Sequence, residues 1–132
     1  MIEEEILIKY HTVAMVGVSS NEDRPSHRVF NYLSSHGYDV IPVNPAFAEM
    51  MGKPCYPDIH AIPQKIEIVN VFRKSDEVMP VVDAAIKAGA KVIWMQEGVI
   101  NESAASKARE AGLQVVMDKC MKKIHESLFR AL

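Results

Sequence analysis

Short apolar runs alternate along this chain with segments in which apolar residues recur every three or four positions. The runs are rich in Val and Ile and are too short for typical helices. Continuous apolar runs of this length are typical of strands that are buried on both faces of a parallel sheet. The pattern predicts five such strands, over residues 12–17, 38–43, 66–72, 91–95 and 113–117.

The segments between these runs have the spacing of amphipathic helices. Ser26, Ser75 and Asn101 stand where an N-cap is expected, and glycines stand where the helices end. Residues 45–63 contain four prolines and predict an irregular connection with at most one helical turn. We expect helices over about 26–36, from Ser75 to Gly89, over about 102–111 and over about 119–131, and a short N-terminal helix whose Glu3, Glu4 and Glu5 face solvent.

Strands that alternate with helices, joined by right-handed crossovers, leave few arrangements. We expect a Rossmann-like three-layer α/β sandwich with a five-stranded parallel sheet, whose strands, numbered along the sequence, lie in the order 3-2-1-4-5. The first and fourth strands would then flank the switch point, where ligands bind beyond the carboxyl ends of the strands. The site would be built from residues 17–26, 43–47, 72–75 and 96–98.

Composition narrows the class of protein. The 132 residues fit a single domain over 1–132, and 48% hydrophobic with 24% charged residues is an ordinary globular balance. A net charge of −2 without a basic stripe argues against nucleic acid as a partner. No apolar run approaches the roughly 18 residues of a membrane span, and the acidic N-terminus is unlike a secretory signal. The two distant cysteines and the lack of metal-ligand spacing favour a reduced, cytoplasmic setting without a metal.

The first strand is followed by a loop that suits an anion. The apolar run stops at Gly17, and small polar residues and Arg24 follow before the next helix begins. Such a turn directs unpaired backbone N–H groups beyond the end of the strand, where a phosphate accepts them. The alternative is a strand-to-helix connection without a ligand.

A redox dinucleotide is a weaker match to this loop. Its fingerprint needs three glycines, but only Gly17 is present, and Ser19 and Glu22 occupy the other two places. The second strand ends in Val43-Asn44-Pro45, without a carboxylate for a ribose hydroxyl. This neutral strand end is expected to tolerate a more anionic nucleotide. An NAD(P)-binding redox protein stays open as an alternative, whereas a P-loop motif is absent from the sequence.

Five separate segments carry a more specific signal. They read VGVSSNEDRPS, VIPVNP, VNVFR, WMQEGV and VVMDKC, in this order. Together they resemble the small single-domain coenzyme A-binding proteins and the N-terminal domain of the succinyl-CoA synthetase alpha subunit. The resemblance covers about residues 12–125.

The resemblance implies that coenzyme A is the ligand and assigns its parts to these segments. The diphosphate would lie near Gly17, Val18, Ser19, Ser20, Asn21, Arg24 and Ser26, and the adenosine near Val43, Asn44 and Pro45. Phe72 and Arg73 would lie beside the ligand, and Gln96, Glu97 and Gly98 would contact the pantetheine arm. The synthetase family has a lysine after the second strand. This chain has Ala46-Phe47-Ala48 there, so Lys53, Arg24 or Arg28 would have to supply that phosphate contact.

The sequence contains no evident set of nucleophile, base and acid, which favours a binding or regulatory module over an enzyme. Cys120 is a candidate thiol contact because it lies near the start of the last helix, where a thiolate is favoured, and coenzyme A itself ends in a thiol. The alternative for Cys120 is packing in the core. A CoA-linked enzyme that uses Cys120, or a partner protein that senses bound coenzyme A, stays open, as does the acyl group.

Overall fold

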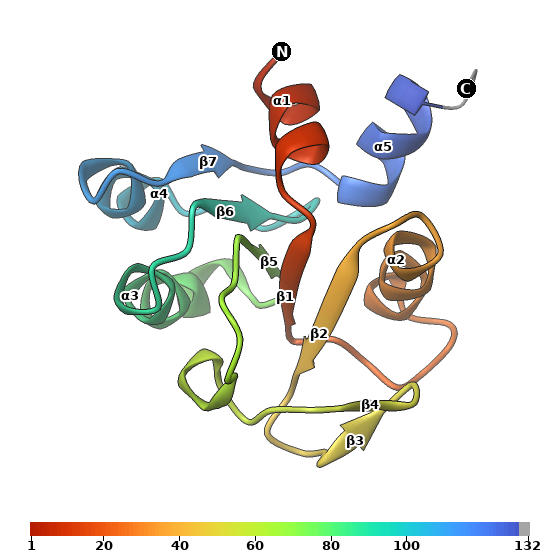
Figure 1. The fold of residues 1–132 in the computed structure, drawn as a ribbon. Helices are drawn as coiled ribbons and strands as arrows, with labels where there is room; N and C mark the ends of the chain where they lie inside the picture. Colours follow the sequence, from red (N-terminus) through yellow and green to blue (C-terminus); the bar gives the residue numbers. More distant parts are fainter. Residues whose placement is uncertain (130–132) are drawn as a thin grey trace.

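The computed structural model describes residues 1–129 and has one central five-stranded parallel sheet (Figure 1). Its strands lie in the spatial order β2-β1-β5-β6-β7. The prediction of an α/β fold with a parallel sheet is confirmed. The strands are β1 (Thr12–Val16), β2 (Asp39–Val43), β5 (Ile68–Val71), β6 (Val92–Met95) and β7 (Gln114–Val116).

The predicted strand order is wrong in one respect. The strand expected outside β2 is β5, which instead pairs with the other side of β1. The outer side of β2 is already occupied, because Tyr56 forms a parallel bridge with Val43 and its N–H donates to the carbonyl of Pro42. A small hairpin of β3 (Glu49–Met50) and β4 (Lys53–Pro54) leads into this bridge. The switch point therefore lies between β1 and β5.

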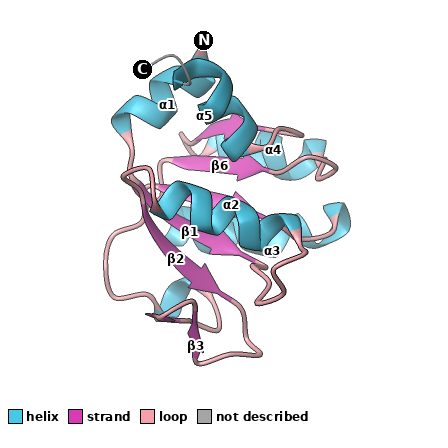
Figure 2. Cartoon of the chain, turned by 90° about the vertical axis from the view of Figure 1, so that its right-hand side faces the viewer, coloured by secondary structure: helices cyan, strands magenta, loops and turns pink. Residues whose placement is uncertain are grey.

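Helices cover both faces of the sheet, as Figure 2 shows. On one face lie α1 (Ile2–Lys9), α2 (Pro25–Ser34) and α5 (Met121–Phe129), and on the other lie α3 (Val78–Lys87) and α4 (Glu102–Glu110). These helices match the predicted ones, although the predicted end of the last helix at 131 lies outside the described residues. Within residues 1–129, no helix is long and apolar enough to cross a membrane.

Each strand contributes side chains to two cores. In β1, Val13 and Met15 pack toward α2, whereas Ala14 and Val16 pack toward α3. Trp94 is fully buried on the α2 side, and its indole N–H donates to the carbonyl of Lys119 over 2.8 Å. Because both faces are covered, a ligand has access to the sheet at the edge where the strands end, which we call the carboxyl edge.

Of the three predicted N-caps, only Asn101 caps a helix, through its side chain and the N–H of Ala104. The Oγ of Ser26 lies inside the first turn of α2 and accepts the N–H of Ser19. Ser75 begins a 3-10 turn before α3, and its Oγ accepts the N–H of Ile100. Both serines thus join loops at the carboxyl edge, which is why neither caps its helix.

The prediction that Glu3 faces solvent is wrong. Glu3 is buried, and its carboxylate lies 2.7 Å from the Nζ of Lys119, in the segment between β7 and α5. The hydrogen bond from Lys119 is the main reason why the pKa of Glu3 is lowered, and it outweighs the opposing effect of burial. The ion pair holds α1 against the segment that leads into α5.

We expect Glu3→Gln to lower the free energy of unfolding at neutral pH by about 1 kcal/mol, because the partner Lys119 is about half exposed and partly solvated. The lowered pKa makes this contribution complete above the ordinary value of 4.5 and removes it as the pH falls through the folded-state pKa. Urea unfolding from pH 7 to acid tests this. Glu5→Gln, at an exposed position of the same helix, is the control. An equal loss for both variants, or a Glu3→Gln deficit that persists in acid, contradicts the assignment.

Candidate ligand-binding edge

Two cavities open at the carboxyl edge, on opposite faces of the sheet. The first, of about 400 Å³, lies between the starts of α2 and α5, and we call it the α2–α5 pocket. The second, of about 430 Å³, lies between the ends of β1 and β2, residues 57–59 and the start of α3, and we call it the α3 pocket. Both volumes are in the range of small-molecule sites.

Gly17 lines the α2–α5 pocket, and its neighbour Val16 lines the α3 pocket. The φ of Gly17 is +87°, and a Cβ atom there would lie 2.4 Å from the carbonyl oxygen of Phe72. Its N–H donates to the carbonyl of Val43, so the turn is fixed to β2 as well. Beside this contact, Phe72 lines the α2–α5 pocket, and the next residue, Arg73, lines the α3 pocket. A side chain at position 17 would therefore separate segments that shape both cavities.

The loop after Gly17 is held by its own side chains. The Oγ of Ser19 accepts the N–H of Asn21, and the Oδ1 of Asn21 accepts the N–H of Asp23. Within residues 1–129, the N–H groups of Val18 and Ser20 donate to no protein acceptor. The loop thus has a defined shape and still offers donors, as an anion-binding turn does.

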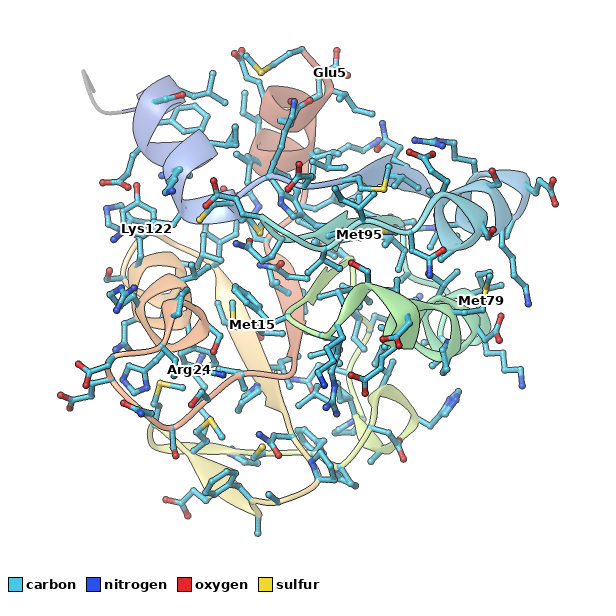
Figure 3. The ribbon with its side chains drawn as sticks, turned by 180° about the vertical axis from the view of Figure 1, so that it is seen from behind. Glu5, Met15, Arg24, Met79, Met95 and Lys122 are labelled. Atoms are coloured by element: carbon cyan, nitrogen blue, oxygen red, sulfur yellow. The ribbon has the colours of Figure 1, made fainter. Side chains whose placement is uncertain are left out.

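Positive charge is in excess around the α2–α5 pocket. Arg24 and Arg28 come from the start of α2, and Lys122 and Lys123 from the start of α5. Figure 3 shows Arg24 and Lys122 at these two helix starts. One cation is neutralised, because Lys123 pairs with Glu97 over 2.9 Å, which raises the pKa of Lys123. The cations exceed the two lining carboxylates, those of Glu97 and Glu126, so an anionic ligand is favoured.

Gln96 fixes the start of α5 beside the same pocket. Its side chain is buried, and its Oε1 accepts the N–H of Met121 over 3.1 Å. Cys120 directly precedes this helix and lines the pocket with 8% of its surface exposed. The N–H of Gly98 donates to the carboxylate of Asp118 over 2.7 Å, which fastens the loop after β6 to the segment before α5. These contacts hold Gln96, Gly98 and the start of α5 in one arrangement.

The α3 pocket differs in charge. Its floor is apolar and includes Ile59 and Val81, while Asp58, Asp76 and Glu77 stand around it. The second strand ends without a carboxylate at residues 43–45, as the sequence indicates, but three carboxylates stand around the pocket beside it. The carboxylates come from the proline-rich connection and from the turn before α3, which the strand ends alone could not indicate.

The structure brings most of the predicted site residues to the two pockets. Asn44 lines neither, but its Nδ2 donates to the carbonyl of Val18 and joins the loops after β1 and β2. Lys53, a candidate phosphate contact, is engaged elsewhere, because its Nζ donates to the carbonyl of Val40 over 2.8 Å. The α2–α5 pocket is lined by Gly17, Ser19, Arg24, Ser26, Phe72, Gln96, Glu97 and Cys120, and the α3 pocket by Val43 and Arg73, whereas Val18, Ser20, Asn21, Asn44, Pro45 and Gly98 line neither.

Sequence reasoning missed the lining residues of α5. Lys122, Lys123 and Glu126 line the α2–α5 pocket from the first turns of this helix. A signal was present, because a helix that follows a parallel strand begins at the carboxyl edge, and side chains three or four positions apart share a face. Within residues 1–129, no group of three or more His, Cys, Asp or Glu side chains is arranged to hold a metal ion.

Known proteins are similar to this chain over most of its length. Residues 11–126 match the model of a family described as a CoA binding domain. YneT, an uncharacterized protein of Bacillus subtilis (strain 168), is 38% identical over 122 residues, which cover 92% of this chain and 90% of YneT. A solved structure of a hypothetical protein from Pyrococcus horikoshii OT3 is 46% identical with a TM-score of 0.94, and the match covers 96% of this chain and 89% of that one.

A larger enzyme contains a similar domain. The dinucleotide-forming acetyl-coenzyme A synthetase 1 of Ca. Korarchaeum cryptofilum is 27% identical to this chain with a TM-score of 0.74. The match covers 86% of this chain but only 27% of the synthetase. The similarity therefore concerns one part of that enzyme.

The close approach at Gly17 yields a test with a matched control. Gly37 also has a positive φ, of +91°, but a Cβ there would meet no atom within 4 Å. We expect Gly37→Ala to lower the free energy of unfolding by about 1–2 kcal/mol through backbone strain. Gly17→Ala should lower it by at least about 1 kcal/mol more, because the backbone at Phe72 has to shift. Urea unfolding measures both, and equal losses would show that the approach is not tight.

Proposed function

Because this chain belongs to the CoA-binding domain family, we propose that it binds coenzyme A or an acyl-coenzyme A across the carboxyl edge, as a stand-alone binding or regulatory module. The observation that carries the proposal is the pair of unlike pockets that Val16 and Gly17 line, one residue to each pocket. Coenzyme A has a nucleotide at one end, a diphosphate in the middle and a thin arm at the other end. A long ligand of this kind needs two cavities with a phosphate-binding turn between them.

The diphosphate belongs over the turn after Gly17. The free N–H groups of Val18 and Ser20 and the hydroxyl of Ser19 are donors there, and Arg24 lies at the start of α2. A guanidinium binds phosphate oxygens in pairs, and the start of this ten-residue helix adds a favourable dipole. Arg24 and Arg28 replace the cation that the loop after β2 lacks.

The two ends of the ligand then take opposite faces of the sheet. The adenosine lies in the α3 pocket, where Val43, Ile59 and Val81 offer an apolar floor. The pantetheine arm lies in the α2–α5 pocket beside Gln96 and Glu97. Both ends are thus matched to cavities of about 400 Å³.

A binding role is favoured over catalysis by the surroundings of the pocket thiol. His125 on α5 does not line the pocket, and its Nδ1 is hydrogen-bonded to the hydroxyl of Tyr32 over 2.7 Å. Within residues 1–129, no histidine or carboxylate is hydrogen-bonded to the Cys120 thiol. Binding is therefore the more economical role for this pocket.

Isothermal titration of the folded protein tests the proposal. We expect heat of binding with coenzyme A and acetyl-coenzyme A and none with NAD or NADP. Arg24→Ala should weaken binding of coenzyme A by about 10-fold, the worth of one charge-assisted phosphate contact. Arg109→Ala, at an exposed position in the last turn of α4, is the control and should change nothing. Heat with NAD, or with no CoA species, would overturn the proposal.

Cys120 lines the pocket that we assign to the pantetheine arm, so its thiol is a contact partner for the thiol end of coenzyme A. We further propose that the Cys120 thiol exchanges with coenzyme A disulfide. The Cys120 thiolate attacks one sulfur of the disulfide, a new protein–CoA disulfide forms, and one CoA thiolate leaves. Coenzyme A disulfide is the oxidant, so the protein thiol is oxidised as one coenzyme A is reduced. Cys55 is the internal comparison, since it lines neither pocket, its thiol donates to the carbonyl of Asn44, and burial raises its pKa.

Intact-protein mass spectrometry after incubation with coenzyme A disulfide tests this exchange. We expect one adduct, which adds the mass of coenzyme A less two hydrogens to the protein and which dithiothreitol removes. Cys120→Ser should abolish the adduct and Cys55→Ser should retain it. An adduct that persists in Cys120→Ser, or the absence of an adduct in a protein that binds coenzyme A, would refute the contact.

A further inference from the structure

The α3 pocket has the opposite charge from the α2–α5 pocket. Three carboxylates, those of Asp58, Asp76 and Glu77, and one guanidinium, that of Arg73, line it. Resting on the proposed function, we infer that this pocket selects against a 3′-phosphate on the ribose, so that the site prefers dephospho-coenzyme A to coenzyme A. The two ligands share the diphosphate and the pantetheine arm and differ only in that phosphate.

The three carboxylate residues belong to hydrogen-bonded turns. Asp76 and Glu77 belong to the 3-10 turn before α3, and the N–H of Glu77 donates to the carbonyl of Lys74 over 2.8 Å. Asp58 caps the 3-10 turn Ile59–Ala61, where its Oδ1 accepts the N–H of Ala61 over 3.1 Å. Within residues 1–129, none of the three carboxylates forms an ion pair. Their negative charge is therefore available to repel a phosphate.

Among residues 1–129, Arg73 is the one cation that lines this pocket. Residues 46–48 are Ala, Phe and Ala. The Nζ of Lys53 donates to Val40 and lies 5.3 Å from the ring centroid of Phe30, on the opposite face of the sheet. Lys74 is exposed but does not line the pocket. A 3′-phosphate would thus meet Arg73 as its sole lining cation, among three like charges.

The expected difference in affinity between the two ligands is set by how exposed the three carboxylates are. Asp58, Asp76 and Glu77 are all exposed, so water and salt screen each interaction. We expect dephospho-coenzyme A to bind about 3- to 10-fold more tightly at low ionic strength, and the difference to shrink in high salt. A ligand bound in the opposite orientation would bring its 3′-phosphate to Arg24, Arg28 and Lys122. Coenzyme A would then bind more tightly than dephospho-coenzyme A.

Isothermal titration of both ligands at about 50 mM and about 500 mM NaCl tests the inference. Asp76→Asn/Glu77→Gln should tighten binding of coenzyme A about 3-fold more than it tightens binding of dephospho-coenzyme A. Glu110→Gln, at an exposed position in the last turn of α4, should alter neither. Circular dichroism checks that each variant is folded.

Each outcome separates the selectivity from the proposed function. Tighter binding of dephospho-coenzyme A with salt-sensitive selectivity supports the inference. Coenzyme A binding equally well or better at low salt, or a double variant that shifts both ligands alike, overturns the inference while the proposed function stands. Binding of neither ligand to folded protein overturns the proposed function and the inference with it.

Discussion

The contact between Gly17 and the backbone of Phe72 is the constraint on which the site depends. It forms because β1 and β5 are neighbours and the chain leaves them in opposite directions, toward α2 and toward α3. The hydrogen bonds from Gly17 to Val43 and from Phe72 to Val16 lock the ends of three strands together. The two pockets lie on either side of this junction, so their relative position is set by sheet pairing rather than by mobile loops.

Strand and helix positions could be predicted because burial on both faces leaves continuous apolar runs, and amphipathic helices keep their period. The position of β5 in the sheet could not be predicted, because it depends on which side of β2 is already occupied. Tyr56, in a connection without a regular pattern, occupies that side. A bridge formed by one residue leaves no periodic signal. Likewise, Ser26 and Ser75 have the residue type of N-caps, but tertiary partners at Ser19 and Ile100 engage their hydroxyl groups.

The site residues that follow strand ends could be predicted from the sequence, whereas most of the charges that distinguish the two pockets could not. Gly17, Phe72 and Gln96 follow strands directly, and all three line the α2–α5 pocket. The charges that distinguish the pockets come from elsewhere: α5 adds lysines to one, and the turns at Asp58 and Asp76 add carboxylates to the other. Such placement arises from packing between distant segments, which a single sequence does not reveal.

A single ligand that spans both pockets is the central claim of this account. Titration of ¹⁵N-labelled protein with coenzyme A, followed by amide chemical shifts, tests it directly. If one molecule crosses the junction at Gly17, amides of Val43 and Arg73 in the α3 pocket and of Glu97 and Cys120 in the α2–α5 pocket will shift together, with one Kd. Shifts confined to one pocket, or two different Kd values, would contradict it.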